Sequence, residues 1–134
     1  MITHVHSVAI VVSDLDRAMK FYRDGLGFEV TADRVDPESI DNRWLTLKPK
    51  WGQTNIMLLK PSLPRTELSS RVGKPTYIVF ETADIRAECE LLKSHNARII
   101  DGPKRAGWGG AIEAHFADPD GNTFLLIQAE PRIT

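Results

Sequence analysis

The chain has 134 residues, the usual length of one domain and enough to bury a core without disulfides. Lys and Arg number 17 against 18 Asp and Glu, so no broad basic field is available to hold nucleic acid or an anionic membrane. Cys89 is the single cysteine, and the sequence lacks both the features of a signal peptide and an apolar run of about 20 residues. We therefore expect a soluble, cytoplasmic protein without nucleic-acid or membrane partners.

The first half of the chain predicts one strand, one helix and three further strands. Val and Ile dominate residues 5–12, and Ser13 is a suitable N-cap for a helix over residues 13–22 that Gly25 and Gly27 end. Three runs rich in β-forming residues follow at 28–34, 43–47 and 55–59. Residues 61–74 are polar and carry two prolines, which favours a connector rather than an element of its own.

The second half repeats this order. A strand is predicted at 77–81, a helix at 84–93 with Ile85, Cys89 and Leu92 on one stripe, a strand at 97–100, and a hairpin of 113–116 and 123–128. The two first strands are related by a period of about 70 residues. We predict one α+β domain, residues 1–134, made of two βαβββ modules. Module one spans 1–60, the connector 61–74 and module two 75–134, and the modules form a cupped mixed sheet with the helices outside.

Four short segments carry a resemblance to a known family. They are VSDLDRA at 12–18, FY at 21–22, LGF at 26–28 and DPDGN at 118–122. In this order, on a duplicated module, the chain resembles the vicinal oxygen chelate superfamily, which includes glyoxalase I, extradiol dioxygenases, fosfomycin-resistance enzymes and bleomycin-binding proteins. The resemblance covers nearly the whole chain and implies the fold. Members differ in chemistry, so the function must be argued from the site.

The resemblance implies a cup lined by both modules, closed between two subunits of a homodimer, with a metal held by the first and last strand of each module. The corresponding positions here are Ser7, Met57, Tyr77 and Leu125. None is a usual ligand for a divalent ion, which takes imidazole, carboxylate or thiolate. A one-residue shift in the register of the first strand would place His6 at the first metal position. It would also turn every side chain of that strand to the other face, and the other three positions would still lack a metal ligand. We predict no metal and no cofactor.

Alternation along the strands predicts which polar side chains line the cup. Glu113 and His115 share a face about 6.8 Å apart along their strand. Arg43 stands 70 residues before Glu113, which predicts the matching face of module one. Tyr77 could donate a hydrogen bond to a bound oxygen, and Trp108, in a glycine-rich loop, could stack on a planar ligand. The predicted ligand-contacting residues are Ser7, Arg43, Met57, Tyr77, Trp108, Glu113, His115 and Leu125.

Each candidate also has a purely structural interpretation. His115 fits a half-buried edge residue with Glu113 as its solvated neighbour. Arg43, on the face that matches Glu113, fits a structural ion pair with a nearby Glu as well as an anion clamp. Tyr77 could fill a vacant metal cavity, and Trp108 could belong to an ordinary turn. By alternation, Trp44 should face the helix and join the core.

Three functions fit these residues. The first is a metal-independent protein of the glyoxalase and bleomycin-resistance type that binds a small, partly planar or acidic molecule in an apolar cup at a homodimer interface. The second is a metal-free lyase or isomerase in which His115 or Glu113 takes a proton and Tyr77 or Arg43 stabilises the oxyanion. The third is a metal-dependent glyoxalase- or dioxygenase-type enzyme, for which the sequence offers no ligand set. The ligand and the pathway are not encoded in any motif.

Overall fold

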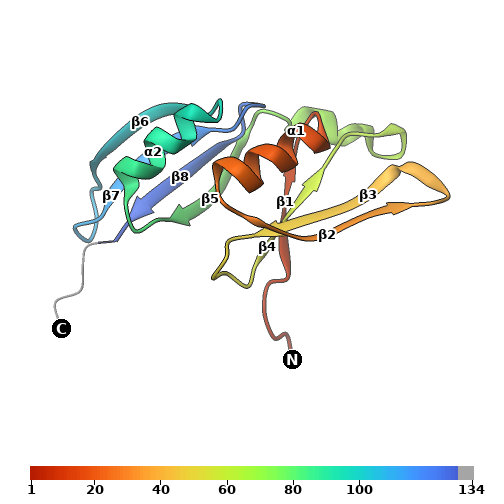
Figure 1. Cartoon of the computed structure of the whole chain (residues 1–134), viewed down its shortest axis with the longest axis horizontal. Coiled ribbons are helices and arrows are strands. Elements are labelled where there is room, and N and C mark those ends of the chain that lie inside the picture. The colour runs from red at the N-terminus through yellow and green to blue at the C-terminus, as the bar shows by residue number, and fades with distance from the viewer. Residues whose placement is uncertain (130–134) are drawn as a thin grey trace. The chain divides into compact units, whose positions relative to one another are not determined.

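The strand–helix–strand–strand–strand order predicted from the sequence occurs twice in the computed structural model (Figure 1). The structure describes residues 1–129, and for residues 39–41 and 63–65 it describes the backbone alone. The chain divides into two compact units, Met1–Val72 and Gly73–Thr134. The α+β class and the pair of βαβββ modules are confirmed.

The elements follow the predicted order with longer strands. Unit 1 contains β1 (Ser7–Val11), α1 (Leu15–Lys20), the π-helical turn η1 (Phe21–Gly25), β2 (Glu29–Asp36), β3 (Ser39–Lys48), β4 (Asn55–Leu59) and the 3₁₀-helix η2 (Leu63–Arg71). Unit 2 contains β5 (Pro75–Glu81), α2 (Ile85–Ser94), β6 (Arg98–Arg105), β7 (Ile112–Ala117) and β8 (Thr123–Gln128). The predicted connector at 61–74 is therefore not without structure, because η2 occupies most of it.

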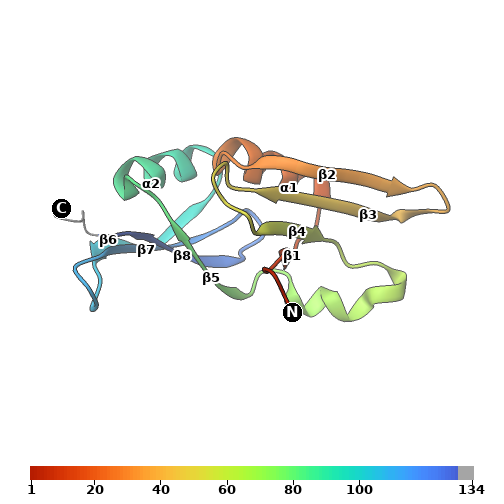
Figure 2. The ribbon, with the colours of Figure 1, turned by 90° about the horizontal axis from the view of Figure 1, so that it is seen from below.

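Both sheets have the same mixed topology, in the orders β1-β4-β3-β2 and β5-β8-β7-β6. The first and last strands of each unit pair in parallel, and the other pairs are antiparallel. In unit 2, α2 packs on β6, β7 and β8 and lies on one side of the sheet (Figure 2). We call the side of each sheet that faces away from its own helix the open face.

Each helix begins at an aspartate that follows the first strand of its unit. The side chain of Asp14 accepts a hydrogen bond from the backbone N–H of Arg17, and that of Asp84 accepts one from Ala87. Both satisfy a helix N-terminal donor that would otherwise lack a partner. The N-cap of α1 is therefore Asp14 and not Ser13, whose hydroxyl instead accepts a hydrogen bond from the guanidinium of Arg17.

The core of unit 2 lies between its sheet and α2. Phe80, Phe116 and Phe124 stack in near-parallel planes, with centroids 5.1 to 6.4 Å apart. Against them α2 places the predicted stripe of Ile85, Cys89 and Leu92, all of which are buried. Burial raises the pKa of the Cys89 thiol, which keeps it protonated and unreactive.

The DPDGN segment closes the hairpin of β7 and β8 and also holds the start of unit 2. The buried carboxylate of Asp118 accepts the backbone N–H groups of Asp120 and Asn122. Gly121 has φ +88°, a conformation that glycine adopts without strain. The side-chain oxygen of Asn122 accepts the backbone N–H of Gly73 at 2.8 Å. No helix within residues 1–129 is long and apolar enough to cross a bilayer.

Candidate functional site

The open face of unit 2 carries a row of three side chains from three neighbouring strands. Val79 of β5 pairs with Leu125 of β8, and Leu125 pairs with His115 of β7. Directly opposite residues in a sheet point to the same face, and Phe124 and Phe116 alternate onto the side of α2. The pairing register therefore places an imidazole beside two aliphatic side chains on the face that α2 leaves uncovered.

A hollow of about 310 Å³ lies over this row. Four of its lining residues are apolar, and the polar groups are one phenol, one hydroxyl and one imidazole. The lining residues are Pro75, Tyr77, Val79, His115, Thr123, Phe124 and Leu125. Ligand sites in proteins have this composition, because apolar walls supply affinity and a few polar groups fix orientation.

Tyr77 stands at the rim of the hollow in an uncommon backbone conformation. Its φ is +60°, in the left-handed region, although it lies within strand β5. A residue other than glycine costs about 1 to 2 kcal/mol in this region. The side chain is 90% exposed, so its phenol and ring are available to a ligand or to a second chain. Strained residues of this kind are enriched at functional sites.

Charged side chains of both signs lie beside the hollow. Across the pair of β6 and β7, Asp101 is opposite His115 and Lys104 is opposite Glu113. Lys104 forms an ion pair with Asp101. The hydrogen bond between the two side chains holds the pKa of Asp101 below its ordinary value and raises the pKa of Lys104. Glu113 does not line the hollow. It stands two residues before His115 on β7 and pairs with Ile127 of β8, so it lies on the same open face.

Trp108 is a predicted ligand contact of unit 2 that lies outside the hollow. It belongs to the turn between β6 and β7, where its carbonyl accepts the backbone N–H of Ala111 at 3.4 Å. The indole is half exposed and is not part of the lining of the hollow. A stacking role for Trp108 stays a prediction.

The open face of unit 1 carries Ser7, Met57 and Trp44. Ala9 pairs with Met57, and Met57 pairs with Thr46, so these positions form a row like that of Val79, Leu125 and His115. Ser7 and Met57 are half-buried, and Trp44 is 46% exposed. Trp44 was missed as an open-face residue, because the 70-residue period placed Arg43 on that face and alternation then assigned Trp44 to the core.

The positions of Arg43 and Trp44 in the sequence-based prediction are wrong. The equivalent pairs Ala9 and Val79, Thr46 and His115, and Met57 and Leu125 are separated by 70, 69 and 68 residues. The period thus shortens along the module, and a one-residue error turns a side chain to the other face. Trp44, not Arg43, is the counterpart of Glu113.

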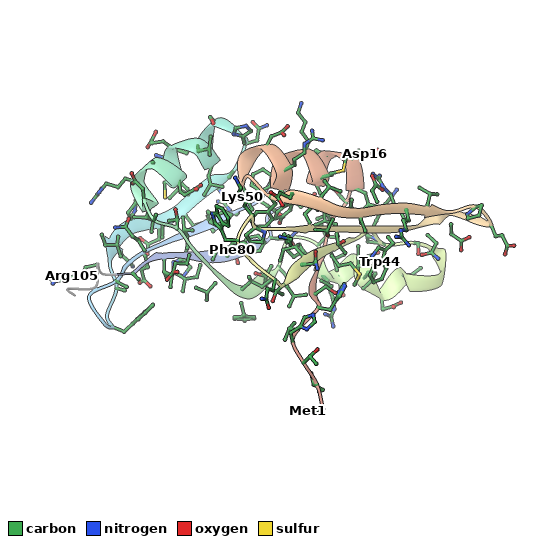
Figure 3. All side chains as sticks on the ribbon, turned by 60° about the horizontal axis from the view of Figure 1, so that its bottom comes forward. Met1, Asp16, Trp44, Lys50, Phe80 and Arg105 are labelled. Carbon is green, nitrogen blue, oxygen red and sulfur yellow. The ribbon has the colours of Figure 1, made fainter. Side chains whose placement is uncertain are left out.

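Arg43 instead points towards α1, because its guanidinium bonds to Asp16 at the start of that helix. Asp16 and Trp44 are labelled on opposite sides of the hairpin of β2 and β3 in Figure 3. The Arg43 guanidinium donates to both carboxylate oxygens of Asp33 at 2.8 and 2.9 Å and to Asp16 at 2.8 Å. The hydrogen bonds from Arg43 hold the pKa of Asp33 below its ordinary value, and those to Asp33 and then Asp16 raise the pKa of Arg43. This is the structural ion pair that the sequence left open, with partners other than Glu113.

A second hollow, of about 350 Å³, adjoins this ion pair in unit 1. Its lining is mostly polar and comes from the start of α1, from Arg43 and from the segment after β4. The lining residues are Ser13, Asp14, Leu15, Asp16, Arg43, Lys60, Pro61 and Ser62. The guanidinium in its wall already has two carboxylate partners, and the mostly polar lining lacks the apolar walls of the hollow in unit 2.

The residues at the four expected metal positions do not fit a metal ion. Ser7, Met57, Tyr77 and Leu125 offer a hydroxyl, a thioether, a phenol and no donor, whereas Zn²⁺ and related ions take imidazole, thiolate or carboxylate. The register of β1 is the predicted one, because Ser7 pairs with Asn55 and His6 precedes the strand. Among the described side chains, no three His, Cys, Asp or Glu gather as a metal site requires.

Of the eight predicted ligand contacts, the structure brings Tyr77, His115 and Leu125 together around one hollow. Their contact with a ligand stays a prediction. Pro75, Thr123 and Phe124 were not predicted as lining residues. Thr123 could have been found by alternation, since it stands two residues before Leu125 on β8.

Comparison with known proteins gives one consistent family. The model of the Glyoxalase/Bleomycin resistance protein/Dioxygenase superfamily matches residues 4–126. The uncharacterized protein YetH of Bacillus subtilis is 30% identical over 126 residues, which cover 94% of this chain and 98% of YetH. The crystal structure of a superfamily member from Sphaerobacter thermophilus is 35% identical with a TM-score of 0.82, and the match covers 95% of this chain and 98% of that one.

An antibiotic-binding protein is also among the similar structures. TnmS3 of Streptomyces sp. CB03234 is 32% identical with a TM-score of 0.77, and the match covers 96% of this chain and 98% of TnmS3.

The ion pair of Arg43 generates a prediction about stability. Replacing Arg43 with Met should lower the free energy of unfolding by about 1 kcal/mol at neutral pH, a modest loss because Asp33 and Asp16 stay accessible to water. Because the folded-state pKa of Asp33 is lowered, the contribution is fully present above the ordinary aspartate pKa of about 4 and is lost as the pH falls below it. Urea unfolding at neutral pH and at about pH 2.5 measures this difference.

The matched control is Arg34→Met, because Arg34 pairs with Trp44 on the open face of the same hairpin. Its effect should stay within about 0.5 kcal/mol at both pH values. Equal losses for Arg43→Met at the two pH values would contradict the ion-pair explanation.

Proposed function

Because the chain belongs to the Glyoxalase/Bleomycin resistance protein/Dioxygenase superfamily, we propose that it binds a small, planar organic molecule in the hollow of unit 2 without a metal ion. The observation that carries this proposal is the hollow itself, where His115, Tyr77 and Thr123 interrupt an otherwise apolar lining. Its volume of about 310 Å³ is near the lower end of the range for ligand sites, so it suits a compact aromatic molecule or one ring system of a larger ligand.

The polar groups suggest how such a ligand is oriented. The Tyr77 phenol and the His115 imidazole can each donate or accept a hydrogen bond, and both line the same hollow. An oxygen of the ligand would form hydrogen bonds with Tyr77 of β5 and His115 of β7. The ring of the ligand would then rest on Val79 and Leu125. A similar structure, TnmS3, is an antibiotic-binding protein, which supports including antibiotics in the first ligand screen.

A metal-free lyase or isomerase is the second candidate. The observation in its favour is that His115 lines the same hollow as the Tyr77 phenol, with Asp101 directly opposite it on the neighbouring strand. His115, or Glu113 two residues away, would take a proton from the substrate, and the Tyr77 phenol would stabilise the resulting oxyanion. Such an enzyme would show a bell-shaped pH dependence that His115→Ala removes, whereas a binding protein would show saturable affinity alone.

The open sheet faces support assembly into a homodimer. Tyr77, Val79 and Trp44 are large side chains exposed on these faces, and a second copy of the chain would cover them. A reducing cytoplasm is the proposed compartment, since Cys89 is the single cysteine and is buried.

The first prediction from this proposal concerns metal content. Protein purified without chelator should contain far less than one Zn, Ni, Fe or Mn per chain by elemental analysis, because the four expected ligand positions hold Ser7, Met57, Tyr77 and Leu125. Addition of a chelator should leave the Tm unchanged. A stoichiometric metal whose removal lowers the Tm would refute metal independence.

The second prediction concerns assembly. Sedimentation at tens of micromolar protein should give a dimer, with an interface that buries about 1,600 Å² or more in total. Val79→Lys places a charge on an open face and should favour the monomer, whereas Leu91→Lys, on the exposed side of α2, should not. A wild-type monomer at this concentration would count against the dimer.

The third prediction concerns the ligand. A thermal-shift screen of aromatic acids, antibiotics and thiol conjugates should identify a binder whose affinity is then measured by calorimetry. Tyr77→Phe and His115→Phe each remove a hydrogen-bonding group and should weaken binding by about 1 to 2 kcal/mol with little change in stability.

Trp51→Phe is the control for an exposed aromatic residue outside the hollow, because Trp51 is exposed in the turn between β3 and β4. It should leave the affinity unchanged. If neither Tyr77→Phe nor His115→Phe alters the affinity of a discovered ligand, the binding site lies elsewhere.

A further inference from the structure

Strand β5 departs from regular pairing next to the hollow. Pro75 pairs with Thr123 and Val79 pairs with Leu125, so β5 advances four residues while β8 advances two. The two extra residues form a bulge that contains Tyr77 at φ +60°. Bulges redirect side chains and are frequent beside active sites.

The side chain of Thr76 supplies the hydrogen bonds that the bulge removes from the ladder. Its hydroxyl donates to the carbonyl of Thr123 at 2.8 Å and accepts the backbone N–H of Ile78 at 3.1 Å. One hydroxyl has a single donor and two acceptor sites, so it can make both bonds at once. Thr76 thus joins β5 to β8 on one side of Tyr77 and satisfies the backbone on the other side.

Unit 1 shows what the same position looks like without this arrangement. Ser7 is the counterpart of Tyr77 by the 70-residue relation of Ala9 to Val79, and it pairs regularly with Asn55. The residue before it is His6, whose carbonyl accepts the backbone N–H of Asn55 at 2.8 Å. The bulge is therefore a feature of the second copy, where Thr replaces His and Tyr replaces Ser.

We propose that Thr76 is a positioning residue that holds Tyr77 in its left-handed conformation and so aims the phenol at the ligand in the hollow. The proposal rests on the proposed function and extends it, because it assigns the orientation of Tyr77 to a residue that does not line the hollow. The ligand class is a planar aromatic molecule with an oxygen within reach of the phenol. Without the Thr76 hydroxyl, β5 loses the bonds that offset the strain at Tyr77, and the ring turns away.

The first test measures the Tyr77 backbone directly and needs no ligand. A residue with φ near +60° gives a strong intraresidue NOE between its amide and α protons, which isotope-edited NMR detects. The wild type and Thr76→Ser should show this NOE at Tyr77, whereas Thr76→Val, which keeps the shape and lacks the hydroxyl, should lose it. Thr76→Ala serves as a second variant without the hydroxyl if Thr76→Val does not fold.

The second test measures affinity for 2-naphthol, a fluorescent planar probe with one hydroxyl. Thr76→Val should weaken binding about five- to thirtyfold, as Tyr77→Phe does, and Thr76→Ser should bind like the wild type. The double variant Thr76→Val, Tyr77→Phe should be no weaker than Tyr77→Phe alone, because both changes remove the same contact. A purely structural role for Thr76 would instead give additive losses.

Besides additive losses in the double variant, two results would overturn the proposal. One is a persistent strong NOE at Tyr77 in both Thr76→Val and Thr76→Ala. The other is loss of the NOE with unchanged 2-naphthol affinity while Tyr77→Phe weakens binding. If the wild type fails to bind 2-naphthol and every other molecule screened, the proposed function fails, and the NOE comparison still decides whether Thr76 holds Tyr77.

Discussion

The pairing of β8 between β5 and β7 is the constraint on which the site in unit 2 depends. Most β8 residues have a partner on both neighbouring strands, so the register of β8 decides which side chains of three strands share a face. It places Phe124 and Phe116 with Phe80 under α2 and leaves Leu125 and His115 on the open face. A shift by one residue would expose the aromatic stack and bury the imidazole, so the packing of the core is also what keeps the chemistry on the open face.

Much of this arrangement follows from patterns that a sequence displays directly. The alternation of Phe124, Leu125 and Leu126 identifies one residue for the open face and two for the core. The DPDGN turn and the stripe of Ile85, Cys89 and Leu92 likewise fix a hairpin and a helix face, because turn chemistry and helical periodicity act locally. These signals explain why the order of elements and the open-face position of His115 were predicted.

The sequence-based predictions failed where they relied on the repeat period between the two units and not on a local pattern. Arg43 and Trp44 exchanged faces because a single period was carried from the first strand to the third. The spacing of equivalent residues already falls from 70 at Ala9 and Val79 to 69 at Glu29 and Arg98, where the second strands begin. The bulges at Thr31 and at Tyr77 were also missed. Threonine is a common strand residue, so Thr31, which bonds to Thr46 and Asn55, and Thr76 look like ordinary members of a ladder until their hydroxyl partners are known.

The hydrogen bond from Gly73 to Asn122 has a consequence for how the gene can change. Gly73 has φ +75°, and a Cβ there would approach the carbonyl oxygen of Asp120 to 2.9 Å, so glycine is required where the chain enters unit 2. The start of unit 2 is therefore held by the turn between β7 and β8 of the same unit. Residues inserted shortly before Gly73 would lengthen the link between the copies without disturbing the pairing of β5, and this junction is therefore a natural point for splitting, fusing or lengthening the duplicated modules.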